Sequence, residues 1–339
     1  MKTCLVVTTI NKPNKNIRAF SKGSQNKKWD FIVIGDKKSP KNFKLNYGQY
    51  FSLKDQIKIN LKFNKICPIN NYARKNIGYL LAFKKNTEII IETDDDNFPK
   101  KNFFSSRNLY HKTFEIKNKS WVNIYNLFTK DKKKEFIWPR GLPLDEIKSN
   151  KINIKKLQKE EKFFLQQGVC EGNPDVDAIY RLMNKNINVK FKKNYSISLG
   201  KSISTFNSQN TTWHKKIFPL MYLPATCSMR CTDIWRSLVT YNILKKDKKK
   251  ILFHGTSMNQ ERNFHDLNKD FEQEIPMYLL NKKIYEVLEK LNLKSGTKNY
   301  SQNLILSYKI LIKKGFIDKK ELFYLYAWLS DCKKLIKNL

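Results

Sequence analysis

The sequence of 339 residues predicts an α/β protein, with a mainly parallel, Rossmann-like sheet flanked by helices and a helical C-terminal extension. Two observations lead to this prediction. In the N-terminal half, apolar runs rich in β-branched residues alternate with helical patterns, which is typical of βαβ units. After residue 265 the apolar residues recur with helical spacing. We therefore predict a core domain of residues 1–265 and a helical extension of residues 266–339.

The N-terminal elements follow one another in a clear order. Residues 4–10 (CLVVTTI) and 31–36 (FIVIGD) predict two buried strands, and residues 72–83 have the apolar spacing of a helix. Residues 89–97 (IIIETDDDN) predict a further strand that runs into three aspartates. In open α/β sheets, ligands gather at the carboxyl ends of the strands. The polar residues predicted to meet at that edge are Thr8, Thr9, Asp36, Asp94, Asp95 and Asp96.

The later part of the chain is less regular. Residues 121–201 mix short apolar runs with turn-rich pieces, and we interpret them as loops that build a site. Thr232 is predicted to cap a helix that has Asp233 in its first turn. A short strand is expected just after this helix, ending at His254. The clearest amphipathic helices are those predicted at residues 277–291 and 321–339.

The charge of the chain is strongly positive, with 66 Lys and Arg against 30 Asp and Glu, a formal net charge of +36. Hydrophobic residues make up 40% of the sequence, which excludes a disordered polycation because so much apolar surface can form a core. Only eight of the basic residues are Arg. Nucleic-acid sites favour Arg for bidentate contacts, so the balance argues against nucleic acid as a partner and fits biased codon usage.

Cysteine usage and hydropathy bear on the compartment. The six cysteines form no CxxC pair, so neither a zinc ribbon nor a disulfide framework is indicated. The N-terminal apolar run is too short for a signal peptide, and no other run reaches the roughly 18 apolar residues of a membrane span. We expect a soluble cytoplasmic protein, and peripheral association with a membrane surface stays open.

The three adjacent aspartates, Asp94 to Asp96, are the most specific feature of the sequence. Adjacent carboxylates repel one another unless a cation separates them, so the cluster suits a hard divalent metal that also contacts a phosphate-bearing substrate. We predict Mn²⁺ or Mg²⁺ at this position. The alternative is an acidic surface turn, which its place directly after a hydrophobic strand disfavours.

Arg74 and Lys75 lie about twenty residues before this cluster, at the start of the predicted helix. A helix N-terminus with adjacent cations is suited to a pyrophosphate group. The alternative is a solvated basic face. A diphosphate site and an acidic metal site on one sheet edge together predict a nucleoside-diphosphate ligand.

The residues around these two motifs carry a resemblance to a known family. RKNIGYLLA and IIIETDDDN together resemble the nucleotide-sugar transferases of GT-A fold, whose DxD motif binds a metal-bridged sugar nucleotide. More closely, the chain resembles the STELLO-type glycosyltransferases and the related reversibly glycosylated polypeptides, the UDP-arabinopyranose mutase family. The resemblance covers most of residues 1–270. It continues in order through FIWPRGLPLDEI, GVCEGNPDVDAIYRL, FNSQNTTW, MRCTDIWRSLV and ILFHGTSMNQERN.

This resemblance implies a donor site at the sheet edge. Asp94 and Asp96 would bind the metal and the diphosphate, and Asp95 would face the sugar or its ribose. Asp36 would hold the nucleoside, with Thr8 and Thr9 beside it. His254 matches a late histidine that completes the metal site in many such transferases, although a lone histidine is often a packing residue.

The resemblance also implies catalytic residues. Arg140 matches the RGxP arginine that is associated with sugar attachment in the mutase family, and its turn leaves the side chain free to reach a phosphate; an ordinary loop cation is the alternative. Asp233 would be the general base for an acceptor hydroxyl or would orient the transferred sugar. Trp235 would stack beneath the sugar or pack in the core.

Asp175 and Asp177 match the GNPDVDA segment of the family and are expected to hydrogen-bond a sugar or an acceptor. Either could instead cap a helix. Thr232 stands where the mutase group often has a second aspartate, so mutase chemistry is less secure than sugar binding.

The sequence therefore predicts a metal-dependent glycosyltransferase of the hexosyl- or pentosyltransferase class. The expected donor is a nucleoside-diphosphate sugar, with a UDP-sugar as first choice, and the acceptor is an unknown glycan or lipid-linked molecule. The alternatives are a sugar-nucleotide mutase and a non-catalytic protein that binds a sugar nucleotide or a polyanion.

Overall fold

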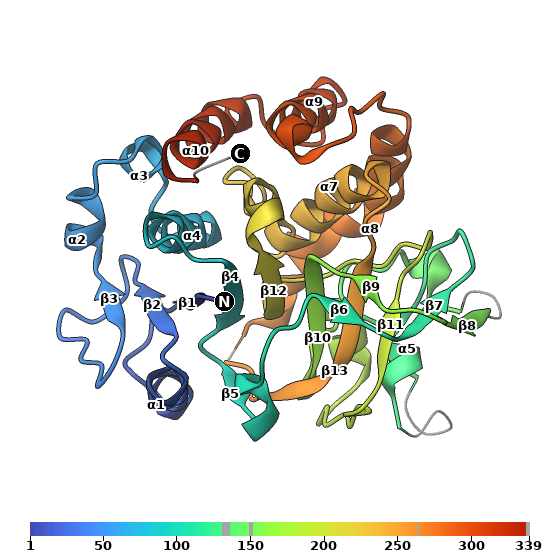
Figure 1. Ribbon diagram of the computed structural model, residues 1–339, viewed down its shortest axis with the longest axis horizontal. Coiled ribbons are helices and arrows are strands. Elements are labelled where there is room, and N and C mark those ends of the chain that lie inside the picture. Colours follow the sequence, from blue (N-terminus) through green and yellow to red (C-terminus); the bar gives the residue numbers. More distant parts are fainter. Residues whose placement is uncertain (131–135, 149–151, 264, 337–339) are drawn as a thin grey trace.

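The computed structural model describes residues 1–130, 136–148, 152–263 and 265–336. Its first four sheet strands are parallel to one another. In sheet order they are β3 (Gln49–Phe51), β2 (Asp30–Ile34), β1 (Thr3–Thr8) and β4 (Ile89–Asp94). Helices α4 (Lys75–Lys84) and α1 (Lys15–Lys27) lie on opposite sides of this part of the sheet (Figure 1). The predicted N-terminal βαβ arrangement is confirmed.

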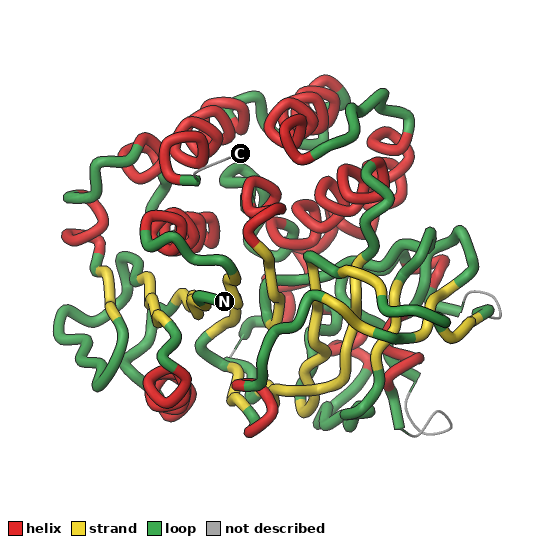
Figure 2. Tube along the Cα trace, viewed as in Figure 1, coloured by secondary structure: helices red, strands yellow, loops and turns green. Residues whose placement is uncertain are grey.

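Beyond β4 the sheet becomes mixed. Strand β12 (Asn210–His214) is antiparallel to both of its neighbours, β4 and β10 (Leu165–Gly172). Strand β10 is parallel to β13 (Ile251–Gln260). The path ends with β11 (Ser196–Ser198), β7 (Phe114–Ile116) and β8 (Ile154–Lys156), while β5 (Asn97–Pro99) pairs with the end of β13. A large sheet flanked by helices confirms the α/β class and is consistent with a GT-A-like fold (Figure 2).

The C-terminal helices pack on the same core as the sheet domain. They are α7 (Thr232–Lys246), α8 (Leu267–Glu289), α9 (Tyr300–Lys313) and α10 (Glu321–Leu335). Trp328 of α10 is fully buried and contacts the rings of Phe63, Tyr79 and Tyr222. The Asp331 carboxylate accepts the backbone N–H of Phe63 at 2.8 Å. Helices α8, α9 and α10 make up most of residues 266–336, as expected for a helical extension, but these helices share one hydrophobic cluster with the residues before them.

The other elements are short. They are α2 (Leu53–Ile57), α3 (Lys62–Ile66), α5 (Ile124–Phe128), α6 (Ala178–Met183), β6 (Tyr110–His111), β9 (Glu161–Lys162), and the 3₁₀ turns η1 (Tyr72–Arg74), η2 (Lys101–Phe104), η3 (Leu144–Glu146), η4 (Lys215–Met221) and η5 (Thr297–Asn299).

Two details of the helices differ from or add to the sequence analysis. Thr232 does not cap α7 through its side chain: it is the first helical residue, and its hydroxyl donates to the Ser228 carbonyl at 3.0 Å. Gly78 lies in the middle of α4, where a Cβ atom would stand 2.5 Å from a Val6 methyl group. Only glycine therefore allows α4 to approach β1 so closely.

Within the described ranges, no helix combines the length and the apolar character that crossing a bilayer requires.

Candidate functional site

The three aspartates lie at the carboxyl edge of the parallel strands, as predicted. Asp94 is the last residue of β4, in register with Thr8 at the end of β1. The central carboxylate, that of Asp95, accepts hydrogen bonds from the Thr9 hydroxyl and from the side-chain amides of Asn11 (2.9 Å) and Asn263 (3.1 Å). Asp95 is buried and held from two distant parts of the chain.

Lys75 reaches the first aspartate. Its ammonium lies 2.6 Å from Asp94 Oδ1 and 2.9 Å from the Tyr72 hydroxyl, which itself donates to the same carboxylate at 2.7 Å. The Lys75 side chain is fully buried, while 30% of the Asp94 side chain is exposed. Lys75 therefore contacts the acidic cluster, as predicted. Both Lys75 and Tyr72 bind Asp94 Oδ1, and neither contacts Oδ2.

Asp96 closes the acidic cluster. It is buried and accepts N–H groups from the side chains of Gln260 (3.0 Å) and Asn97 (3.2 Å). Burial, followed by repulsion from Asp94, raises the pKa of Asp96 to about 6. A cation at the cluster would offset the repulsion from Asp94.

Arg74 is not at this site, which corrects its predicted role at a diphosphate. Its buried guanidinium donates to the Gln56 side chain (3.1 Å) and to the Cys67 carbonyl (3.1 Å), and so holds the segment before α4. Asp36 holds the same segment, because its carboxylate accepts the backbone N–H groups of Asn70 (2.9 Å) and Asn71 (3.1 Å).

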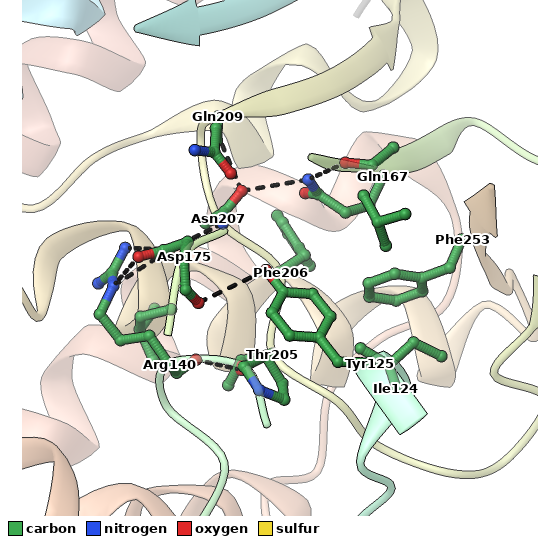
Figure 3. Close-up of a pocket in the computed structure, with 14 residues that line it drawn as sticks. Ile124, Tyr125, Arg140, Gln167, Asp175, Thr205, Phe206, Asn207, Gln209 and Phe253 are labelled. Carbon is green, nitrogen blue, oxygen red and sulfur yellow. Dashed lines mark hydrogen bonds and ion pairs between the residues drawn. The ribbon is translucent and has the colours of Figure 1, made fainter. Parts of the chain in front are cut away.

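Arg140 is clamped between two aspartates, Asp175, which Figure 3 shows beside it, and Asp233. Its Nε and Nη2 atoms lie 2.9 Å from oxygens of Asp175, and its Nη1 and Nη2 atoms lie 3.0 and 2.9 Å from the two oxygens of Asp233. All three side chains are at most 9% exposed. The expectation that Arg140 is free to reach a phosphate is therefore wrong in this structure, because the N–H groups of its guanidinium already donate to Asp175 and Asp233.

Asp175 is held further by Arg230, whose Nη2 atom lies 3.7 Å from its carboxylate. Burial alone would raise the pKa of Asp175, but Arg140 and Arg230 hold it well below its usual range. Asn207 also donates to Asp175, at 2.8 Å. A small pocket opens beside the clamp, lined among others by Gln167, Asn207 and Phe253 (Figure 3).

Ser208 joins the acidic cluster to the clamp. Its backbone N–H and hydroxyl lie 3.2 and 3.4 Å from Asp233 Oδ2, and its hydroxyl also contacts the Tyr72 hydroxyl. Its carbonyl accepts from Lys75 at 3.3 Å. The path Asp94, Tyr72, Ser208, Asp233 is therefore a continuous chain of hydrogen bonds across the carboxyl edge of the sheet.

Two predicted substrate-binding residues have structural contacts instead. Asp177 is the N-cap of α6: it accepts the Tyr180 N–H at 2.8 Å and the indole N–H of Trp138 at 2.7 Å. Trp235 is 4% exposed and donates to Asn281 of α8 at 2.9 Å. In both cases the structure favours the capping and packing alternatives.

The structure does not bring His254 to the acidic cluster. Along the parallel pairing with β10, His254 is opposite Gly168, whereas Gln260, which contacts Asp96, is opposite Gly172. Gly168 and Gly172 are four residues apart on β10, which corresponds to a separation of about 13 Å along the strand. Among the described residues no three His, Cys, Asp or Glu side chains converge in a metal-ligand arrangement.

Sequence reasoning missed the neutral residues that link the site. Tyr72 and Lys75 are three residues apart, a spacing that places side chains on one side of a helix and could have paired them. Ser208, Asn207 and Gln260 carry no charge and come from loops or strand ends, so no local pattern identified their partners.

Comparison with known proteins bears on the family. The sequence model described as STELLO glycosyltransferases matches residues 230–338, which include Asp233 and all of α7 to α10. "Probable glycosyltransferase STELLO2" of Arabidopsis thaliana is 27% identical over 254 residues, covering 68% of this chain and 32% of that protein. "Probable glycosyltransferase STELLO1" of the same plant is 26% identical with the same coverage. This chain is similar to the STELLO glycosyltransferases over about two thirds of its length.

The STELLO-type resemblance predicted from the motifs is thus confirmed. The chain spans about a third of the length of these curated relatives. A solved structure titled "Crystal Structure of a Mycobacterial Protein" aligns over 83% of this chain and 74% of its own, with 9% identity and a TM-score of 0.38. A similarity this low supports no inference about fold or function.

Proposed function

We propose that this chain is a glycosyltransferase that uses a nucleoside-diphosphate sugar, with its active site running from the acidic cluster to Asp233. One observation carries the proposal: the hydrogen-bonded path through Tyr72 and Ser208 joins a site suited to a diphosphate with a buried carboxylate suited to an acceptor. The relationship to the STELLO glycosyltransferases supports the same activity.

The residues present fit a hard divalent cation such as Mn²⁺ or Mg²⁺. Asp94 has a partly exposed carboxylate, and the repulsion that raises the pKa of Asp96 would be relieved by a metal charge. Two carboxylates suffice when substrate phosphate oxygens and water complete the coordination shell. Asp94 and Asp96 would hold the ion, and when bound it would neutralise charge on the leaving diphosphate.

The protein residues would then position the reaction. Lys75 neutralises the charge of Asp94 from the interior of the protein, and its fully buried side chain excludes water from that side of the carboxylate. Arg140 and Ser208 fix the orientation of Asp233, which would receive the proton of the acceptor hydroxyl. Arg140 would act through Asp233 and Asp175 and not by touching the diphosphate.

The donor is expected to be a UDP-sugar, with a hexosyl or pentosyl group passed to a glycan or lipid-linked acceptor. No observation favours mutase chemistry over transfer. At the position where the mutase group often has an aspartate, Thr232 is buried and bonded to the Ser228 carbonyl.

A panel of UDP-sugars with Mn²⁺ tests the proposal. The wild-type protein should hydrolyse or transfer at least one donor, and a double variant, Asp94→Ala with Asp96→Ala, should lose at least a hundredfold in rate. The matched control removes two exposed acids of α8, Glu272→Ala with Glu286→Ala, and should keep the wild-type rate. Full turnover by the Asp94/Asp96 variant would refute the assignment, and NMR analysis of the products separates transfer from ring interconversion.

A further inference from the structure

Three arginines, one buried and two partly buried, lie near the acidic cluster, in a chain that has only eight arginines among its 66 basic residues. Arg230 and Arg262 both contact Asp270, with Arg230 Nε at 4.0 Å from one carboxylate oxygen and Arg262 Nη2 bonded to the other. Arg181 is the third member, 6% exposed. We call Arg181, Arg230 and Arg262 the arginine cluster.

Arg181 is the member whose charge is least compensated. Its guanidinium donates to the Asn173 side chain and to the Pro174 carbonyl (2.7 Å), both of which are neutral groups. Within the described part of the chain no carboxylate lies within 4.0 Å of it, and its Nε atom has no hydrogen-bond partner. A buried charge without a counter-charge is costly, so such positions are normally paired.

The other two arginines are paired with carboxylates, Arg230 with Glu274 at 2.6 Å and Arg262 with Asp270, but both still repel Arg181. Burial, followed by repulsion from Arg262 and, more weakly, from Arg230, lowers the pKa of Arg181 to about 9. Burial and repulsion from Arg230 also lower the pKa of Arg262. A further anion beside Arg181 would offset the repulsion that this side chain experiences.

The arginine cluster borders the proposed donor site. The Asn173 N–H donates to the Gln260 carbonyl at 3.1 Å, and the Gln260 side chain contacts Asp96 at 3.0 Å. Arg262 follows Gln260 by two residues. Arg181 is therefore linked to Asp96 through Asn173 and Gln260. Arg74 does not reach the acidic cluster, and Lys75 is already paired with Asp94.

We propose that Arg181, Arg230 and Arg262 form a binding site for a phosphate-type oxyanion. The planar guanidinium fork presents two N–H groups to two oxygens of one phosphate, which lysine cannot do. The source of the oxyanion is either the donor diphosphate or an anionic group on the acceptor. Only this last step, the molecule that carries the oxyanion, rests on the proposed function.

Binding of pyrophosphate in EDTA, at constant ionic strength and followed by calorimetry, tests the site without metal and without turnover. The wild-type protein should bind, and the variant Arg181→Lys with Arg262→Lys should bind at least tenfold more weakly while keeping its charge and the partner of Asp270. Arg18→Lys, at an exposed position of α1, is the matched control and should bind as the wild type does. Absence of wild-type binding, or equal binding by the double variant, would overturn the proposal.

A second arm identifies the source. Saturating UDP with Mn²⁺ should displace pyrophosphate if the arginines hold the donor, and should leave it bound if they hold the acceptor. Either result supports the site. If the protein proves to have no transferase activity, pyrophosphate binding in EDTA is unaffected, so the two proposals fail separately.

Discussion

The ammonium of Lys75 lies 2.6 Å from Asp94 Oδ1, with the lysine fully buried and the aspartate partly exposed. Replacing the lysine, as in Lys75→Met, leaves this carboxylate without its cation. We expect a loss of about 1–3 kcal/mol in the free energy of unfolding. Mn²⁺ should restore more stability to the variant than to the wild type, because the ion would take over the charge of the ammonium. Urea unfolding with and without Mn²⁺ measures both, and equal effects of Mn²⁺ on the two proteins would contradict this interpretation.

The clamp around Arg140 predicts a large effect of Asp175→Asn. Both side chains of this pair are less than 10% exposed, and removing one partner of a buried ion pair typically costs about 3–5 kcal/mol. Chemical denaturation should show a loss of this size. The matched control, Asp145→Asn, affects an aspartate that is 67% exposed, and should change stability by less than about 0.5 kcal/mol. A small effect of Asp175→Asn would mean that the clamp is not closed in solution.

Asp177 predicts a pH dependence of stability. Burial raises its pKa to about 6 in the folded protein, from about 3.9 in an unfolded chain. The folded state therefore binds this proton more tightly, and the contribution of Asp177 to stability is present below pH 4 and is lost as the pH rises through 6. Asp177→Asn keeps a capping oxygen and cannot ionise.

The difference in stability between Asp177→Asn and the wild type should therefore shift in favour of the variant by up to about 3 kcal/mol between pH 4 and pH 7.5. Unfolding at both pH values measures it. A difference that does not change with pH would show that Asp177 has an ordinary pKa.

At Gly78 we expect alanine to destabilise the protein, contrary to the higher helix propensity of alanine. Alanine usually stabilises a helix relative to glycine by about 1 kcal/mol. Here its Cβ atom would meet Val6 at 2.5 Å, so Gly78→Ala should instead destabilise by about 1–3 kcal/mol. If thermal unfolding showed a stabilised variant, the packing of α4 on β1 described above would be incorrect.

The parts that the sequence predicted well depend on local patterns. The hydrophobic run that ends at Asp94 and the general rule for parallel strands placed the acidic cluster correctly at the sheet edge. Arg74 and Lys75 were predicted to act together, but successive residues of a helical turn point in different directions, and only Lys75 faces Asp94.

The clamp could not be predicted in the same way. Asp175 and Asp233 follow Arg140 by 35 and 93 residues in the sequence. Only the packing of loops and α7 brings the three side chains together. The arginine cluster depends on equally distant residues. The prediction for His254 failed because this residue lies on the same strand as Gln260 but several residues before it, too far along the strand to reach Asp96.

The central claim is that the acidic cluster, from Asp94 to Asp96, binds a metal together with the diphosphate of a nucleotide sugar. Calorimetric titration with UDP, in the presence of Mn²⁺ and then of EDTA, tests it most directly. The wild-type protein should bind UDP at least tenfold more tightly with Mn²⁺, and the variant Asp94→Ala with Asp96→Ala should show no effect of Mn²⁺. UDP binding that is the same with Mn²⁺ and with EDTA, or an unchanged effect of Mn²⁺ in the variant, would contradict the claim.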